Sequence, residues 1–161
     1  MDTFPLVFVR DIEFPTVIVW DAFVDAELMS GWLGDARIAP EIGGEFRVEW
    51  RHRPTVAPMI GTIVDMHSPD RLTIDTLPMG RLWFELAEFP GGNRGTSTRV
   101  RVTVEAAIEP VFAARVRADW LTNLDQLEEL LRGHPVDWAH WDRDWGSAWS
   151  AHLEEGENST A

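Results

Sequence analysis

The sequence contains no cysteine, no tyrosine and no lysine among its 161 residues. Without cysteine there is no disulfide framework, no thiolate nucleophile and no cysteine-ligated zinc or iron–sulfur site. Without tyrosine, no phenol side chain can act as an acid or as an oxyanion donor. The chain must therefore be stabilised by a hydrophobic core, and its length is sufficient for one such core in a single domain.

Positive charge is also scarce, because 14 basic residues, all arginine, stand against 27 acidic ones and leave a net charge of −13. Such a surface repels nucleic-acid phosphates and anionic lipids, so we expect neither nucleic acid nor a membrane as a partner. No apolar run approaches the roughly 20 residues that cross a bilayer. The N-terminus has Asp2 where a secretory signal has basic residues, and its apolar run breaks at Arg10, which predicts a cytoplasmic protein.

Alternating and β-branched stretches are abundant and are separated by short turns, which is typical of an antiparallel sheet. They predict six strands, at residues 6–12, 45–50, 59–66, 71–75, 82–89 and 98–105. Two short helices are predicted after the first strand: Thr16–Val24, with Val17, Trp20 and Val24 on its apolar face, and a second that begins at the N-cap Asp25.

A long amphipathic helix is predicted after the last strand. It begins near Pro110, and Gly133 and Pro135 end it. Apolar side chains recur through it at helical spacing, at Phe112, Val116, Trp120, Leu124, Leu127 and Leu131. Helices segregated from an antiparallel sheet indicate the α+β class.

Several groups of residues occur in a characteristic order. VWDAFVD at 19–25 and GWLG at 31–34 are followed by IGGEFR at 42–47, GTIVD at 61–65, PDRL at 69–72, GGNRGT at 91–96 and WLTNLDQLEELL at 120–131. Together, over about residues 7–132, they resemble the Hsp90-activator-like family of the START/Bet v 1 (SRPBCC) superfamily.

The resemblance implies a helix-grip fold, in which a curved antiparallel sheet wraps the long helix and the first strand pairs with the last. It also implies an apolar cavity between sheet and helix, where members of the superfamily carry lipids, sterols, hormones or polyketide intermediates, and where some catalyse cyclisation or hydrolysis. Eukaryotic Hsp90 activators have a further N-terminal domain, for which we expect no room in a chain of this length. We expect a helix-grip domain at 1–133, a helical extension at 134–153 and a flexible tail at 154–161.

The side chains that strand alternation and helical spacing direct inward are all apolar. We expect them to line the cavity of a small hydrophobic or aromatic ligand, or else to form a filled core. The candidate lining residues are Phe46, Val48, Trp50, Leu72, Ile74, Phe84, Val102, Phe112, Val116, Trp120 and Leu124.

Few polar residues offer chemistry in such a cavity. His52 lies at a strand end near the expected mouth and could act as an acid or base, but it is also what an exposed loop histidine looks like. The polar cluster His134, Asp137, His140, Asp142 and Asp144 lacks a spacing that fixes a ligand geometry, so we interpret it as a solvated loop. The sequence therefore indicates no catalytic residue, no metal site and no cofactor.

Beyond the long helix, Trp138, Trp141, Trp145 and Trp149 recur at spacings of three, four and four. Four tryptophans on one helical stripe are costly to leave in water, so they must dock. Three partners remain open: the domain's own surface, across the sheet or the pocket mouth; a second copy in a homodimer; or another protein.

The functional hypothesis from the sequence is a non-catalytic module that binds a small hydrophobic molecule. Two alternatives stay open. One is a cyclase- or hydrolase-like enzyme that uses the same cavity, which requires an ionisable group on the pocket wall. The other is a protein-interaction, chaperone-associated module.

Overall fold

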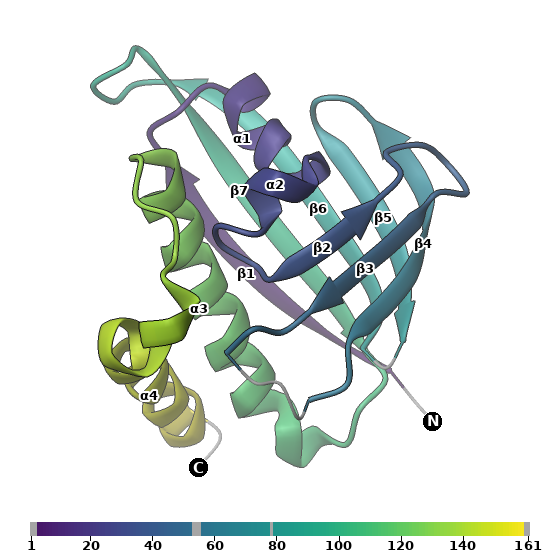
Figure 1. The fold of residues 1–161 in the computed structure, drawn as a ribbon, viewed down its shortest axis with the longest axis vertical. Helices are drawn as coiled ribbons and strands as arrows, with labels where there is room; N and C mark the ends of the chain where they lie inside the picture. Colours follow the sequence, from purple (N-terminus) through teal and green to yellow (C-terminus); the bar gives the residue numbers. More distant parts are fainter. Residues whose placement is uncertain (1–2, 53–55, 78, 160–161) are drawn as a thin grey trace.

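The computed structural model describes residues 3–52, 56–77 and 79–159. Seven antiparallel strands form one curled sheet in the order β1-β7-β6-β5-β4-β3-β2, and helices lie against it (Figure 1). The strands are β1 (Phe4–Ile12), β2 (Asp35–Ile38), β3 (Glu45–Glu49), β4 (Met59–His67), β5 (Arg71–Leu77), β6 (Gly80–Pro90) and β7 (Thr96–Ala106). The predicted α+β class is confirmed.

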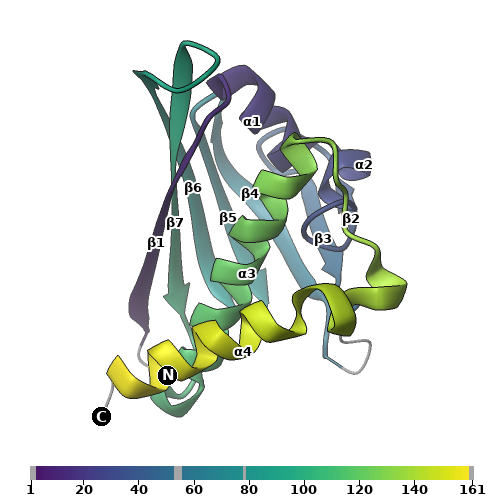
Figure 2. The same ribbon diagram turned by 90° about the vertical axis from the view of Figure 1, so that its left-hand side faces the viewer.

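The first and last strands are neighbours, as the helix-grip fold requires. β1 pairs with β7 along its whole length, from Phe4 opposite Ala106 to Ile12 opposite Thr98. The sheet curls so that its concave face wraps the long helix α3 (Ala113–Leu131), which crosses it diagonally in Figure 2. The helix-grip architecture is therefore confirmed.

One strand escaped sequence prediction. β2 is only four residues long and pairs with β3 at the edge of the sheet, with Asp35 opposite Glu49 and Ile38 opposite Phe46. Its sequence, DARI, is too short to show an alternating pattern and includes two charged residues. Strands of this kind form because a longer neighbour offers them a hydrogen-bonding edge.

The two short helices, α1 (Thr16–Val24) and α2 (Ala26–Met29), lie where the sequence predicted them. Asp25 caps α2, since its side chain accepts hydrogen bonds from the backbone N–H groups of Glu27 and Leu28. The predicted apolar face of α1 was partly wrong, because Val17 is 61% exposed. The buried stripe is instead formed by Thr16, Val19, Trp20, Ala22 and Phe23.

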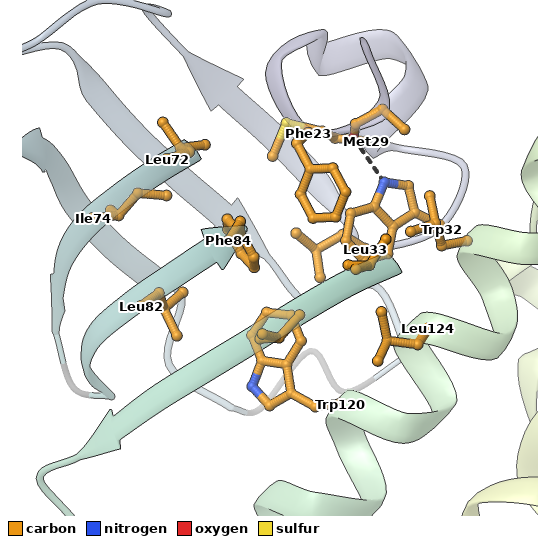
Figure 3. Packing of buried hydrophobic residues seen from close by; sticks show 14 of the residues in the cluster. Phe23, Met29, Trp32, Leu33, Leu72, Ile74, Leu82, Phe84, Trp120 and Leu124 are labelled. Carbon is orange, nitrogen blue, oxygen red and sulfur yellow. Dashed lines mark hydrogen bonds between the residues drawn. The ribbon is translucent and has the colours of Figure 1, made fainter. Parts of the chain in front are cut away.

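Aromatic side chains from three elements meet in the core between sheet and helices (Figure 3). The ring of Phe23 lies 5.1 Å from that of Trp32, edge to face, and 4.8 Å from that of Phe84, whose ring is 5.9 Å from Trp120 of α3. The indole of Trp32 donates a buried hydrogen bond to the Ala22 carbonyl, at 2.8 Å. This cluster fixes α1, β6 and α3 relative to one another.

The chain continues past α3, which we call the grip helix, into a second long helix. α3 ends before Gly133, whose φ of +94° suits glycine, and a 3-10 turn, η2 (Trp138–His140), leads into α4 (Trp141–Ser159). α4 packs on α3 on the side away from the sheet (Figures 1 and 2). Of the segment expected as a flexible tail, residues 154–159 are the last turns of α4, and Thr160 and Ala161 lie outside the described residues.

No helix in the described part of the chain is both long enough and apolar enough to cross a membrane.

Candidate functional site

The interior between sheet and helix is largely filled. Most of the expected cavity residues are buried side chains of the core, namely Phe46, Val48, Leu72, Ile74, Phe84, Val102, Val116, Trp120 and Leu124. Trp50 is partly buried and packs against this core. Of the eleven expected lining residues, the structure places only Trp50 and Trp120 on the wall of the pocket described below.

Phe112 was expected to face the interior, and this was wrong. Its side chain is 46% exposed and lines an outer groove with Val111 and Glu157. The reason is local. Pro110 starts a 3-10 turn, η1 (Pro110–Phe112), so Phe112 is out of phase with the buried stripe of α3 that begins at Val116.

A pocket of about 70 Å³ opens where the end of β3, the start of β4 and the β5–β6 turn approach the middle of α3. We call it the grip pocket. It is lined by Trp50, His52, Val56, Met59, Met79, Asp119, Trp120 and Asn123. Its volume is well below the few hundred Å³ typical of ligand cavities, so it accommodates one end of a ligand rather than a whole one.

An open groove adjoins the grip pocket and shares Trp50 and Val56 with it. The groove has a volume of about 470 Å³ and is otherwise charged. Arg51 donates to Asp35 at 3.0 Å on its rim. The two spaces together offer an apolar end and a polar, solvent-facing continuation.

One wall of the grip pocket is polar. Asp119 and Asn123 stand one turn apart on α3, so both side chains emerge on the same face of the helix. Asn123 is only 3% exposed, and no side-chain hydrogen bond of its amide occurs within the described ranges. Its amide is not among the fully buried polar groups without a partner, so it reaches the space of the pocket.

His52 is not the exposed loop histidine that was the simpler interpretation of the sequence. It is partly buried and stacks on two rings of the C-terminal extension, at 4.4 Å from Trp141 and 5.7 Å from Trp138. An ionisable imidazole therefore lies on the pocket wall, in a position held by aromatic stacking.

The tryptophan-rich extension, formed by η2 and α4 and called the tryptophan helix below, docks on its own domain, around the grip pocket rather than across the sheet. Trp138 Nε1 donates to the Ser30 carbonyl at 2.7 Å, Trp141 Nε1 to Gln126 Oε1 at 2.7 Å, and Trp149 Nε1 to Asp119 Oδ1 at 2.8 Å. Trp145 is partly buried. Three indole N–H groups thus find acceptors within the chain, two of them on α3.

A charged cluster ties β1, α3 and α4 together at another place. Asp125 of α3 accepts from Arg10 of β1 at 2.7 Å and lies 2.8 Å from Nε2 of His152 on α4. Burial by itself would lower the pKa of Arg10, but hydrogen bonds and charge attraction to Asp125 and Glu128 raise it above its ordinary value. This cluster holds the elements in place and lies outside the grip pocket lining.

Four of the five residues in the polar cluster that was interpreted as a solvated loop take part in separate charged pairs. His134 lies 3.1 Å from Glu129, His140 lies 2.7 Å from Asp137, and Asp144 accepts from Arg143. Among the described residues, no group of three or more metal-ligating side chains comes together.

Sequence reasoning missed the polar wall, although a signal was present. Asn123 lies seven residues after Val116 and three after Trp120, so helical spacing alone places it on the buried stripe. An amide on an otherwise apolar stripe marks either a satisfied core position or a site. Met59 and Met79 were also missed, because residues at strand ends and turns carry no alternation that shows where they point.

Solved structures share this fold at low sequence identity. CalU16 from Micromonospora echinospora is 21% identical, with a TM-score of 0.63 over 94% of this chain and 89% of that one. A protein from Bordetella parapertussis is 19% identical, with a TM-score of 0.69 over 98% and 86%. DynU16, described as a putative protein in the dynemicin biosynthetic locus, is 20% identical, with a TM-score of 0.67 over 81% of this chain and 48% of DynU16. The chain thus spans about half of DynU16.

A search of curated proteins returned no match. The family model described as Activator of Hsp90 ATPase homolog 1-like protein matches residues 13–132, which run from the end of β1 to the end of α3. η2 and α4 lie beyond the matched region. The matched residues cover most of the sheet and the grip helix, and the chain belongs to the Activator of Hsp90 ATPase homolog 1-like protein family.

Proposed function

We propose that the protein binds a small hydrophobic or aromatic molecule in the grip pocket. The observation that carries this proposal is the set of side chains that line that pocket. Two tryptophans and two methionines, Trp50, Met59, Met79 and Trp120, surround it. Aromatic and thioether side chains adapt well to flat apolar ligands of varied shape.

The volume of the pocket decides how such a ligand sits. About 70 Å³ takes one end of the molecule, and the rest extends past Trp50 and Val56 into the adjoining groove. The charged rim of that groove suits a ligand whose outer part is polar. One structural relative, DynU16, is described as a protein of a biosynthetic locus, which agrees with a role in handling a small molecule.

Native mass spectrometry of the freshly purified protein, followed by organic extraction, tests the proposal. A reproducible extra mass of a few hundred daltons per chain supports it. The variant Met79→Trp, which fills the pocket, should lose this mass, while Ile60→Trp on the exposed face of β4 should keep it. If both variants keep the mass, the ligand binds elsewhere and the proposal fails.

A cyclase- or hydrolase-like enzyme is the second candidate, and one observation favours it. His52 and Asp119 both lie on the pocket wall, so ionisable groups are present where an acid or base would be needed. If the extracted compound is converted on incubation, His52→Gln should abolish turnover while the mass of bound compound persists. A compound recovered unchanged after incubation would leave binding as the activity.

A further inference from the structure

We infer that the grip pocket selects ligands that carry a hydroxyl group, with Asp119 and Asn123 as the residues that recognise it. This inference rests on the proposed function and adds the chemical class of the ligand. It starts from Asn123, a residue only 3% exposed on the pocket wall, whose amide has no side-chain hydrogen bond among the described residues.

The polar wall offers a specific set of hydrogen-bonding groups. The carboxylate of Asp119 accepts hydrogen bonds, and the amide of Asn123 both donates and accepts. A hydroxyl group also does both, so it can donate to Asp119 and accept from the Asn123 amide at once. An ether or a halogen can only accept, and a methyl group does neither.

Asp119 is held in position for this role by the C-terminal extension. Trp149 Nε1 donates to Asp119 Oδ1 at 2.8 Å, and this bond fixes the carboxylate on the pocket wall one turn of α3 away from Asn123. A carboxylate whose orientation is set before binding loses less conformational freedom when a ligand arrives.

A charged amine is the competing donor, and the remaining walls disfavour it. Apart from His52, the rest of the wall is apolar, so an ammonium group would lose its hydration with only one carboxylate in compensation. A neutral hydroxyl loses far less. Phenols and alcohols are therefore the ligands that both the polar and the apolar walls accept.

Fluorinated benzenes, of which 4-fluorophenol and 4-fluorotoluene have nearly equal shapes, test this inference by fluorine NMR titration of the 161-residue chain at neutral pH. They are 4-fluorophenol, 4-fluorotoluene and 4-fluoroanisole, with 4-fluorobenzylamine as the cationic comparison. We expect 4-fluorophenol to bind about tenfold more tightly than the other three, as one good hydrogen-bonded pair contributes. Perturbed indole signals of Trp50 and Trp120 would show that the probes occupy the grip pocket.

Two variants assign the preference to residues. Asn123→Leu should lower the phenol-to-toluene affinity ratio while 4-fluorotoluene still binds. Asp119→Asn, which keeps an oxygen for Trp149, should also lower the ratio, and it carries the test if Asn123→Leu does not fold. Asp142→Asn removes a carboxylate from the exposed face of α4 and should leave the ratio unchanged.

The outcomes separate the two proposals. If none of the probes binds the unaltered protein, the proposed function fails. If the phenol and toluene bind equally, or the amine binds most tightly, the pocket binds ligands but the hydroxyl preference is wrong. A preference that survives both pocket variants would place the recognition elsewhere and overturn the assignment to Asp119 and Asn123.

Discussion

The indole of Trp149 donates a hydrogen bond to the carboxylate of Asp119 at 2.8 Å, and Asp119 in turn lines the grip pocket. One bond therefore connects the C-terminal helix, which lies beyond the region matched by the family model, to the wall of the candidate site. His52, which also lines the pocket, repeats the relationship, since Trp138 and Trp141 stack on it. The extension both covers α3 and organises the polar side of the pocket.

Removal of the extension should destabilise the domain. A chain truncated after Gly133 loses the buried ring of Trp141 and the indole hydrogen bonds to Ser30, Gln126 and Asp119. Loss of a buried tryptophan alone typically costs about 3–5 kcal/mol. We expect urea denaturation to show a lower midpoint and a free energy of unfolding reduced by at least that amount. The exposed face of α3 should also promote association.

An unchanged midpoint for the truncated chain would contradict a structural role for the extension. It would instead support the alternative in which the tryptophan helix serves a second copy or a partner protein. The variant Asp142→Ala, on the exposed side of α4, should behave like the unaltered chain and controls for changes in the helix surface.

Gln126 links two parts of the molecule that are far apart in sequence. Its amide donates to the Trp32 carbonyl at 2.6 Å, and its carbonyl accepts from Trp141 Nε1 at 2.7 Å. Gln126→Leu leaves the buried indole N–H without an acceptor, and we expect a loss of about 2 kcal/mol in the free energy of unfolding.

A double-mutant cycle separates this bond from simple packing. Trp141→Phe removes the donor. Gln126→Leu should therefore lower the free energy of unfolding less in the Trp141→Phe background than in the unaltered protein, with a coupling of about 1–2 kcal/mol. Chemical denaturation of the four proteins measures the coupling. Additive costs would show that Gln126 contributes through the Trp32 carbonyl or through shape rather than through Trp141.

The fold was predictable in outline because its long elements have strong patterns. β7 alternates Val100, Val102 and Val104 with polar residues, and the structure buries all three. β2 was not predictable, since four residues cannot show a period, and its strand character comes from pairing with β3. α4 was predicted as amphipathic, but its docking place depends on where acceptors such as Gln126 lie in three dimensions.

The candidate site was less predictable than the fold. The sequence directed attention to apolar lining residues, and most of these fill the core. The pocket is instead formed by residues from the β3–β4 loop, the start of β4, the β5–β6 turn and α3, which only the folded chain brings together. Asn123 was accessible to sequence reasoning because helical spacing placed an amide on the buried face.

The ion pair between Asp11 of β1 and Arg99 of β7 should show a clear dependence on pH. The hydrogen bond from Arg99, aided by charge attraction, holds the pKa of Asp11 below its ordinary value. Since the folded pKa lies below the unfolded one, the pair stabilises the fold at neutral pH. That contribution is lost as the pH falls through the folded pKa of Asp11.

Carboxyl-carbon NMR titration measures this directly. In Arg99→Gln, the pKa of Asp11 should rise toward its ordinary value, whereas Arg101→Gln, two residues along the same strand, should leave it low. The effect on stability should be small, because both side chains are about half exposed and solvent screens such pairs. An equal rise in both variants would mean that the general charge of β7, rather than the Arg99 hydrogen bond, lowers the pKa.

Phe112 of η1 and Trp120 of α3 test which side chains of this region face the interior. Phe112→Ser should change the free energy of unfolding by less than about 1 kcal/mol, as is usual for exposed positions. Trp120→Ala should cost about 3–5 kcal/mol, because it leaves a large cavity beside Phe84. The two residues lie eight positions apart and their expected costs differ severalfold. Denaturation curves that show similar losses for both would mean that the 3-10 turn at Pro110 does not turn Phe112 outward in solution and that Phe112 belongs to the interior.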